Sequence, residues 1–310
     1  MPPRPDTRRP NAKTLAAIGV TLLLWASAFA GIRVGLEGGY GPGQVALLRF
    51  LTASLVLVVY AVLTRMRMPS WQDVPGIALS GFFGITVYHA ALNFGEQTVT
   101  AGAASLLIAS GPVFTALLAS IALKERLTLW GWTGVVISFC GTALIALGEG
   151  SGLTFDTGAL LILLAAVATS LYFVFQKPYL RRYGAFEMTA YCIWAGTIFL
   201  LPFAPGLLAQ LPVVDSGATV AVVYLGVFPG AIAYVLWTYA LSRMPAGVLT
   251  SYLNLSPLLA IVIAWLWISE VPTLVSLIGG AIAIGGVTLV TLRGHAAQRI
   301  PVRSNHDDIG

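Results

Sequence analysis

Charged side chains are scarce in this sequence. Asp, Glu, Lys and Arg make up 9% of its 310 residues, whereas 57% are hydrophobic and the mean hydropathy is +0.86. Soluble domains are about 25% charged, so this chain has too few charges to cover a water-exposed surface. The scarcity excludes a soluble enzyme, a nucleic-acid-binding domain and a disordered chain, and it predicts an integral membrane protein.

Cysteine and the common catalytic motifs are also sparse or missing. Cys140 and Cys192 both lie inside apolar runs, so they suggest neither a disulfide framework nor metal-ligand spacing. The sequence has no H-E-x-x-H motif, no G-x-S-x-G elbow and no P-loop. We therefore expect no enzyme, no catalytic residue, no cofactor and no metal, and we do not expect an ATP-driven pump.

Long apolar runs dominate the sequence. A helix needs about 20 apolar residues to cross the bilayer, whereas the strands of a membrane barrel alternate polar and apolar residues. Runs of helical length predict an all-α membrane protein with ten transmembrane helices between two tails, 1–13 and 293–310. The predicted spans are 14–36, 44–63, 74–94, 100–122, 129–148, 157–176, 185–205, 218–240, 246–268 and 273–292.

Basic residues gather on one side of the predicted spans. Apart from Arg33 and Arg49, every Lys and Arg lies in a tail or in one set of alternate loops. The other set of loops contains acidic residues and no Lys or Arg. The positive-inside rule then predicts that the N and C termini are both cytoplasmic.

The second half of the sequence repeats the first. Segment 101–147 aligns with 246–292 without a gap, at a constant offset of 145. Each half would hold five helices, an odd number, so the second copy enters the membrane from the opposite side. This predicts two inverted five-helix repeats, 14–148 and 149–292, an architecture that permits alternating access to a central site. Duplication for stability alone is the alternative interpretation.

Three short elements carry a resemblance to a known family. They are Trp25-x-Ser27-x-Phe29, Arg49-Phe50 and the doubled pair Pro112…Glu125 and Pro257…Glu270. With them the chain resembles the EamA-type transporters of the drug/metabolite transporter superfamily. The resemblance implies ten helices in two inverted repeats and a carrier in a bacterial-type inner membrane. In its Tyr88-His89 pair the chain is similar to the bacterial aromatic amino acid exporters, and this resemblance implies amino acid export.

Polar residues inside the spans form one part of the candidate site. His89, Asn93 and Glu96 are spaced i, i+4 and i+7, so they share a helix face. Because unpaired polar groups in lipid are costly, this face should meet a cavity or another helix. A histidine that only packs is the alternative for His89. We expect Arg33, Arg49 and Glu96 to place charge near the outer entrance.

Aromatic residues deep in the spans form the other part, because they lie too far from the interfaces to be explained as an aromatic belt. Aromatic rings suit flat apolar or cationic substrates. The predicted substrate-binding residues are Trp25, Ser27, Phe29, Tyr88, His89, Asn93, Tyr172, Gln176, Tyr234, Trp237, Ser251 and Asn254.

Two prolines occupy the centres of the fourth and ninth predicted spans. Pro112 and Pro257 each remove a backbone N–H and should free the carbonyl four residues earlier, at Ile108 and Leu253. Their matching positions in the two repeats predict paired gating hinges. A static kink that aids packing is the alternative.

The sequence predicts a carrier that exports small organic metabolites, with aromatic or other neutral amino acids as the expected substrates. A carrier for another amphipathic or cationic metabolite or drug, a channel and an intramembrane enzyme are the alternatives. The expected partners are a small-molecule substrate and the lipid bilayer, not nucleic acid, and a monomer is compatible with the sequence. His89 and Glu96 are the candidate proton carriers, and we expect facilitated exchange or weak proton dependence.

Overall fold

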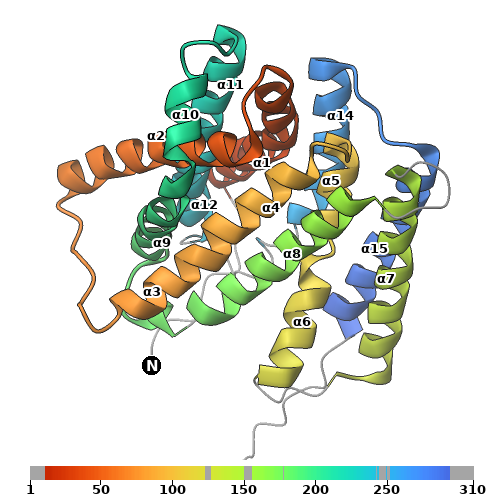
Figure 1. The fold of residues 1–310 in the computed structure, drawn as a ribbon. Helices are drawn as coiled ribbons and strands as arrows, with labels where there is room; N and C mark the ends of the chain where they lie inside the picture. Colours follow the sequence, from red (N-terminus) through yellow and green to blue (C-terminus); the bar gives the residue numbers. More distant parts are fainter. Residues whose placement is uncertain are drawn as a thin grey trace, which may run out of the picture.

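The computed structural model describes residues 11–122, 127–149, 156–176, 178–241, 243, 249 and 252–293. The described residues form helices joined by short connections (Figure 1). Glu125 of the repeated pair and the candidate residue Ser251 lie outside the described residues.

Within these ranges, nine helical stretches are long and apolar enough to cross a membrane, and one further apolar helix, Tyr252–Ile268, is shorter. The prediction of an all-α membrane protein is thus confirmed for the described residues. The start of the ninth predicted span, 246–268, lies largely outside them. The helices are α1 (Ala12–Glu37), α2 (Pro42–Thr64), α3 (Val74–Gly81), α4 (Tyr88–Gly95), α5 (Ala101–Ile108), α6 (Gly111–Ala122), α7 (Leu129–Glu149), α8 (Thr157–Gln176), α9 (Ala185–Leu200), α10 (Ala204–Gln210), α11 (Ser216–Val227), α12 (Ala233–Leu241), α14 (Ser256–Ile268) and α15 (Leu274–Arg293).

The third and eighth spans each contain a π-helical segment. Phe82–Val87 joins α3 to α4, and Phe228–Ile232 joins α11 to α12. The offset of 145 takes residues 82–87 to 227–232, so the two segments occupy corresponding positions in the two halves. Such wide turns are rare and occur often at functional sites.

The two central prolines begin new helices and do not bend continuous ones. Pro112 is the second residue of α6, and Pro257 is the second residue of α14, which follows the 3₁₀ turn Tyr252–Leu255. A proline is tolerated in the first turn of a helix, where its missing N–H has no intrahelical acceptor. The expected single kinks are therefore helix restarts.

Helices α7 and α15 lie side by side along their length (Figure 1). Glycines make this approach possible: a Cβ on Gly141 would come within 2.3 Å of the Ala283 nitrogen, and one on Gly134 within 2.8 Å of the Gly286 oxygen. Small residues permit close helix approach between membrane helices. The fifth and tenth spans therefore form one tightly packed pair.

Elsewhere the two halves interleave. Helix α1 packs against α11, α12 and α14, and its counterpart α8 packs against α3, α4, α5 and α6. Likewise α2 packs against α11, where Gly226 faces the Arg49 oxygen, and α9 packs against α3, where Gly81 faces the Cys192 oxygen. The contacts that α1 and α2 make with the second half therefore match those that α8 and α9 make with the first half. The candidate residues of α1, α2, α4 and α12 lie where the halves meet.

Candidate functional site

The structure brings three of the predicted aromatic residues together where α1 meets α12. The Trp25 ring centroid lies 5.4 Å from that of Tyr234 and 5.1 Å from that of Trp237. The Trp25 indole N–H donates a hydrogen bond of 3.2 Å to the Pro229 oxygen, inside the second π segment. All three rings are half-buried. We call Trp25, Tyr234 and Trp237 the aromatic cluster. It connects the first span to the eighth span, beside the second π segment.

A second group of rings surrounds Arg49. Its guanidinium carbon lies 5.4 Å from the centroid of the Phe50 ring, and the Phe50 centroid lies 4.4 Å from that of His89. Tyr88 meets His89 edge-on, with centroids 4.5 Å apart. Arg49 also interacts electrostatically with Tyr88 and Tyr234, which connects this group to the aromatic cluster.

Arg49 lies inside the protein, away from the first turn of α2. Helix α2 begins at Pro42, so Arg49 lies about 10 Å along the helix axis from that end. Its side chain turns into the protein, and the residue is 5% exposed. Arg49 therefore belongs to the interior of the site.

Unpartnered polar atoms gather at this place. Among the described residues, six buried side-chain nitrogen or oxygen atoms have no hydrogen-bond partner, and five of them belong to one group of residues; the sixth is Ser138 Oγ. Buried polar groups are normally hydrogen-bonded, so such a concentration marks a place where a ligand can supply the partners. We call this group the polar stripe: Arg49 (Nε), His89 (Nδ1), Asn93 (Oδ1) and Glu96 (Oε1 and Oε2).

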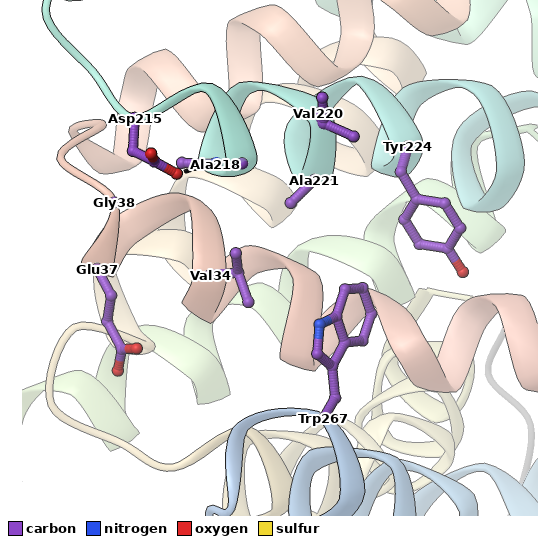
Figure 2. Close-up of a pocket in the computed structure, with 10 residues that line it drawn as sticks. Val34, Glu37, Gly38, Asp215, Ala218, Val220, Ala221, Tyr224 and Trp267 are labelled. Atoms are coloured by element: carbon purple, nitrogen blue, oxygen red, sulfur yellow. Dashed lines mark hydrogen bonds between the residues drawn. The ribbon is translucent and has the colours of Figure 1, made fainter.

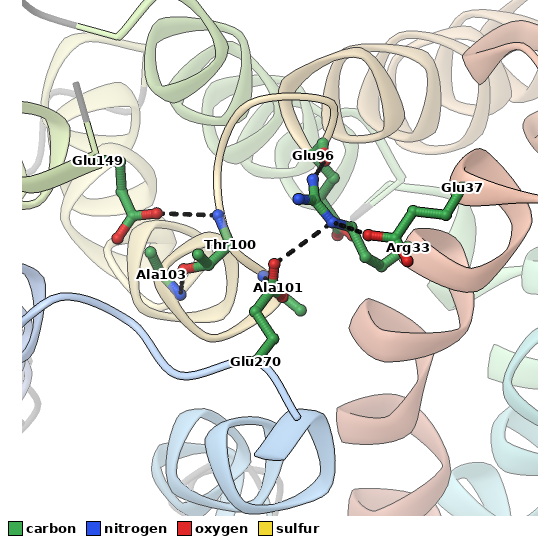
Figure 3. A network of polar contacts seen from close by, with 8 residues as sticks. All are labelled: Arg33, Glu37, Glu96, Thr100, Ala101, Ala103, Glu149 and Glu270. Atoms are coloured by element: carbon green, nitrogen blue, oxygen red, sulfur yellow. Dashed lines mark hydrogen bonds and ion pairs between the residues drawn. The ribbon is translucent and has the colours of Figure 1, made fainter. Parts of the chain in front are cut away.

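Arg33 lies in a different environment at the end of α1 (Figure 3). Its Nε lies 3.0 Å from Glu37 Oε1 and 3.3 Å from Glu270 Oε1. Its Nη1 donates to the backbone oxygen of Glu96. Arg33 is thus an ion-paired residue that connects α1 to the end of α4 and to the α14–α15 connection.

Two carboxylates bind the start of α5 in the same network (Figure 3). Glu270 Oε2 accepts a hydrogen bond of 2.8 Å from the Ala101 N–H, and Glu149 Oε2 accepts one of 2.9 Å from the Thr100 N–H. Ser276 donates to Glu149 Oε1 at 2.7 Å. Acidic groups are favourable at a helix N-terminus, where backbone N–H groups lack partners. This network holds together the ends of α1, α4, α5, α7 and α15.

The remaining predicted residues make other contacts. The Ser27 hydroxyl shares a hydrogen bond of 2.7 Å with the hydroxyl of Tyr224, and Phe29 is buried in the core. The Tyr172 ring packs closely over Gly84, beside the first π segment, and Gln176 is buried at the end of α8. Asn254 is exposed in the turn before α14.

A groove of about 710 Å³ runs between α1, α11 and α14, and the sequence did not point to it. Figure 2 shows Glu37 and Asp215 at one end and Tyr224 and Trp267 at the other. Tyr224 and Trp267 meet edge-on with centroids 5.9 Å apart. The aromatic residue Tyr224 inside a predicted span was the available signal, but its partner Trp267 is distant in sequence.

A fully partnered polar cluster joins the start of α3 to the connection before α9. Arg182 Nη1 lies 2.6 Å from Asp73 Oδ1, while Tyr183 and Ser70 donate to Asp73 Oδ2 at 2.6 and 2.9 Å. The hydrogen bond from Tyr183, followed by those from Ser70 and Arg182, lowers the pKa of Asp73 below its ordinary value. We call these four residues the Asp73 cluster.

Comparison with known proteins gives a consistent family. A profile of the EamA-like transporter family matches residues 13–147 and 156–292, that is, once in each half. The transporter YdfC of Bacillus subtilis (strain 168) is 43% identical over 293 residues, which is 94% of this chain and 95% of that protein.

Two further similarities bear on function and fold. A probable terminal-alkyne amino-acid exporter of Streptantibioticus cattleyicolor is 42% identical over 288 residues, covering 93% of this chain and 96% of that protein. A protein of known crystal structure shares the fold with a TM-score of 0.58 and 22% identity, over 91% of this chain and 98% of that chain.

Proposed function

Since this chain belongs to the EamA-like transporter family, we propose that it is a membrane carrier that exports small organic metabolites, with aromatic or other neutral amino acids as its substrates. The substrate binds between the halves, beside the aromatic cluster and the polar stripe. Access to this place alternates between the two sides of the membrane.

The exchange of contacts between the halves is the observation that carries the proposal. Helix α1 packs on the eighth and ninth spans as α8 packs on the third and fourth, and the two π segments correspond. Such an arrangement supports two inverted repeats that rock against each other around one site. The helix restarts at Pro112 and Pro257 then provide matched flexible points.

The charge distribution supports cytoplasmic termini, and the similarity to bacterial transporters supports a bacterial-type inner membrane. Except for Arg33 and Arg49, the basic residues all lie in the tails or in one set of alternate loops. The network of Arg33, Glu37, Glu270 and Glu149 then lies at the outer surface. In this conformation that network closes the outer ends of α1, α5 and α7 against one another.

The composition of the site supports the substrate class. Half-buried rings of Trp25, Tyr88 and Tyr234 offer apolar contact area for a side chain, and the polar stripe offers unpartnered donors and acceptors. The similarity to a probable terminal-alkyne amino-acid exporter supports the same class.

Transport by purified protein in proteoliposomes tests the proposal. We expect saturable uptake of radiolabelled phenylalanine or leucine, accelerated by unlabelled amino acid on the opposite side, as an exchanging carrier requires. Protein-free liposomes are the control. Absence of saturable flux for every amino acid would contradict the substrate class.

The same assay separates the alternatives. Competition by a lipophilic cation such as tetraphenylphosphonium, without competition by amino acids, would assign a cationic substrate. Flux that stays proportional to concentration would instead indicate a channel.

A further inference from the structure

Deepening the proposed function, on which this inference rests, we propose that the polar stripe recognises the zwitterionic backbone of an amino acid. Arg49 binds the α-carboxylate, and His89 and Asn93 accept hydrogen bonds from the α-ammonium group. The aromatic cluster receives the side chain.

Arg49 fits the carboxylate because it is a buried cation that forms no ion pair. It is 5% exposed, its Nε has no acceptor, and no ion pair within the described residues includes it. A buried unpaired charge is costly, so an anion that enters beside it gains a large electrostatic stabilisation. The planar guanidinium matches a carboxylate in shape and donor spacing.

Arg33 does not fit this role. Its guanidinium already contacts Glu37, Glu270 and the backbone oxygen of Glu96. A substrate carboxylate there would have to displace two acidic side chains. The interior arginine is therefore the carboxylate-binding residue.

The acceptors for the ammonium group lie on the neighbouring helix. Asn93 Nδ2 donates to the Pro42 oxygen at 3.0 Å, which fixes the amide orientation and leaves Oδ1 as an unpartnered acceptor. His89 Nδ1 is unpartnered one turn away, and its ring is held between Phe50 and Tyr88. Arg49 interacts electrostatically with His89, so the donor and this acceptor lie near each other.

Glu96 adds a carboxyl group at the end of α4 nearest the outer network. Both of its carboxylate oxygens are buried and unpartnered, and Arg49 interacts with it electrostatically. One arginine with hydrogen-bond acceptors nearby thus matches a molecule that carries a carboxylate and an ammonium group on the same carbon atom. A dicarboxylate or a simple amine would leave half of these groups unpartnered.

Substrate analogues test this match with the unaltered protein. Phenylalanine, phenylalaninamide, which lacks the carboxylate, and 3-phenylpropionate, which lacks the ammonium group, compete against radiolabelled phenylalanine in proteoliposomes. Leucine and leucinamide provide the same comparison without an aromatic ring. We expect each analogue to compete at least about tenfold more weakly than its parent amino acid. Equal competition by the amides would overturn the assignment of a carboxylate-binding group.

Variants then assign the two groups. In Arg49→Gln we expect phenylalanine and its amide to compete equally. In Asn93→Leu, where His89 remains as an acceptor, we expect the preference for phenylalanine over 3-phenylpropionate to become smaller. Arg67→Gln, at an exposed arginine between α2 and α3, is the control and should keep both preferences. Unchanged preferences in Arg49→Gln or Asn93→Leu would overturn that residue's role.

The outcomes separate this inference from the proposed function. If no amino acid is transported or competes, the proposed function fails. If amino acids are transported but their amides and deaminated analogues compete equally well with them, the carrier stands and the zwitterion site fails.

Discussion

The Asp73 cluster and the polar stripe use similar residue types in opposite ways. Both oxygens of Asp73 accept hydrogen bonds, from Arg182 on one side and from Tyr183 and Ser70 on the other. In the polar stripe, by contrast, five buried atoms have no hydrogen-bond partner among the described residues: Arg49 Nε, His89 Nδ1, Asn93 Oδ1 and both side-chain oxygens of Glu96. The first cluster is complete within the protein, whereas the second leaves atoms that the proposed substrate would pair with.

This difference predicts opposite effects of substitution. Removing one member of a satisfied polar cluster leaves its partners unpaired, which destabilises the fold. Removing a buried charge that has no partner takes away a cost, so the empty protein keeps or gains stability. Transport should fall on substitution in the polar stripe and persist on substitution in the Asp73 cluster, because the proposed substrate binds the unpartnered groups.

The largest expected effect follows from replacing Arg49 with methionine, a hydrophobic residue of comparable length. Loss of a charged hydrogen-bonding partner should lower amino acid uptake about 100-fold. The melting temperature of the empty protein in detergent should stay the same or rise. Uptake in proteoliposomes and thermal unfolding of the same preparation measure both. Unchanged uptake with a lower melting temperature would show that Arg49 is structural.

Substitution Asp73→Asn should give the converse result. The neutral amide keeps the size of the side chain but weakens the contacts with Arg182, Tyr183 and Ser70, so the melting temperature should fall. The concentration for half-maximal uptake should stay the same, because Asp73 lies at the start of α3, away from the polar stripe. Asp215→Asn, at another helix N-cap, is the matched control.

The spans and the repeat could be predicted because both can be recognised without knowing which helices touch. Apolar length identifies a membrane helix, and the constant offset between 101–147 and 246–292 needs no structure. The matching π segments at Phe82–Val87 and Phe228–Ile232 were not predicted, because a wide turn has no strong local signature.

The partners of the site residues were less predictable. Trp25, Tyr234 and Trp237 were expected in one site and do meet. The hydrogen bond between Ser27 and Tyr224 and the ion pair between Arg33 and Glu270 join residues that are distant in sequence. Spacing along one helix does not define such contacts. The burial of Arg49 depends on where α2 begins and on which face of α2 packs against the neighbouring helices.

A smaller effect is expected from pH, because the contacts of the Asp73 cluster depend on the charge of Asp73. The pKa of Asp73 is lowered in the folded protein, chiefly by the hydrogen bond from Tyr183, so its stabilisation is present above the ordinary pKa of about 3.9 and is lost as the pH falls through the lowered value. The difference in melting temperature between the unaltered protein and Asp73→Asn should therefore shrink below about pH 4. A difference that stays constant down to pH 3 would contradict a charge-dependent role.

The smallest expected effect tests whether the aromatic cluster acts together with the polar stripe. Trp25→Phe keeps a ring beside Tyr234 and Trp237 but removes the hydrogen bond to the Pro229 oxygen. The smaller ring also offers less contact to the side chain of a bound substrate, and a loss of about 1 kcal/mol of ring contact would weaken phenylalanine uptake about fivefold. Alanine, whose methyl group does not reach the cluster, should be transported almost as before. An equal loss for both substrates would show that Trp25 supports the π segment alone and that only the polar stripe contacts the ligand.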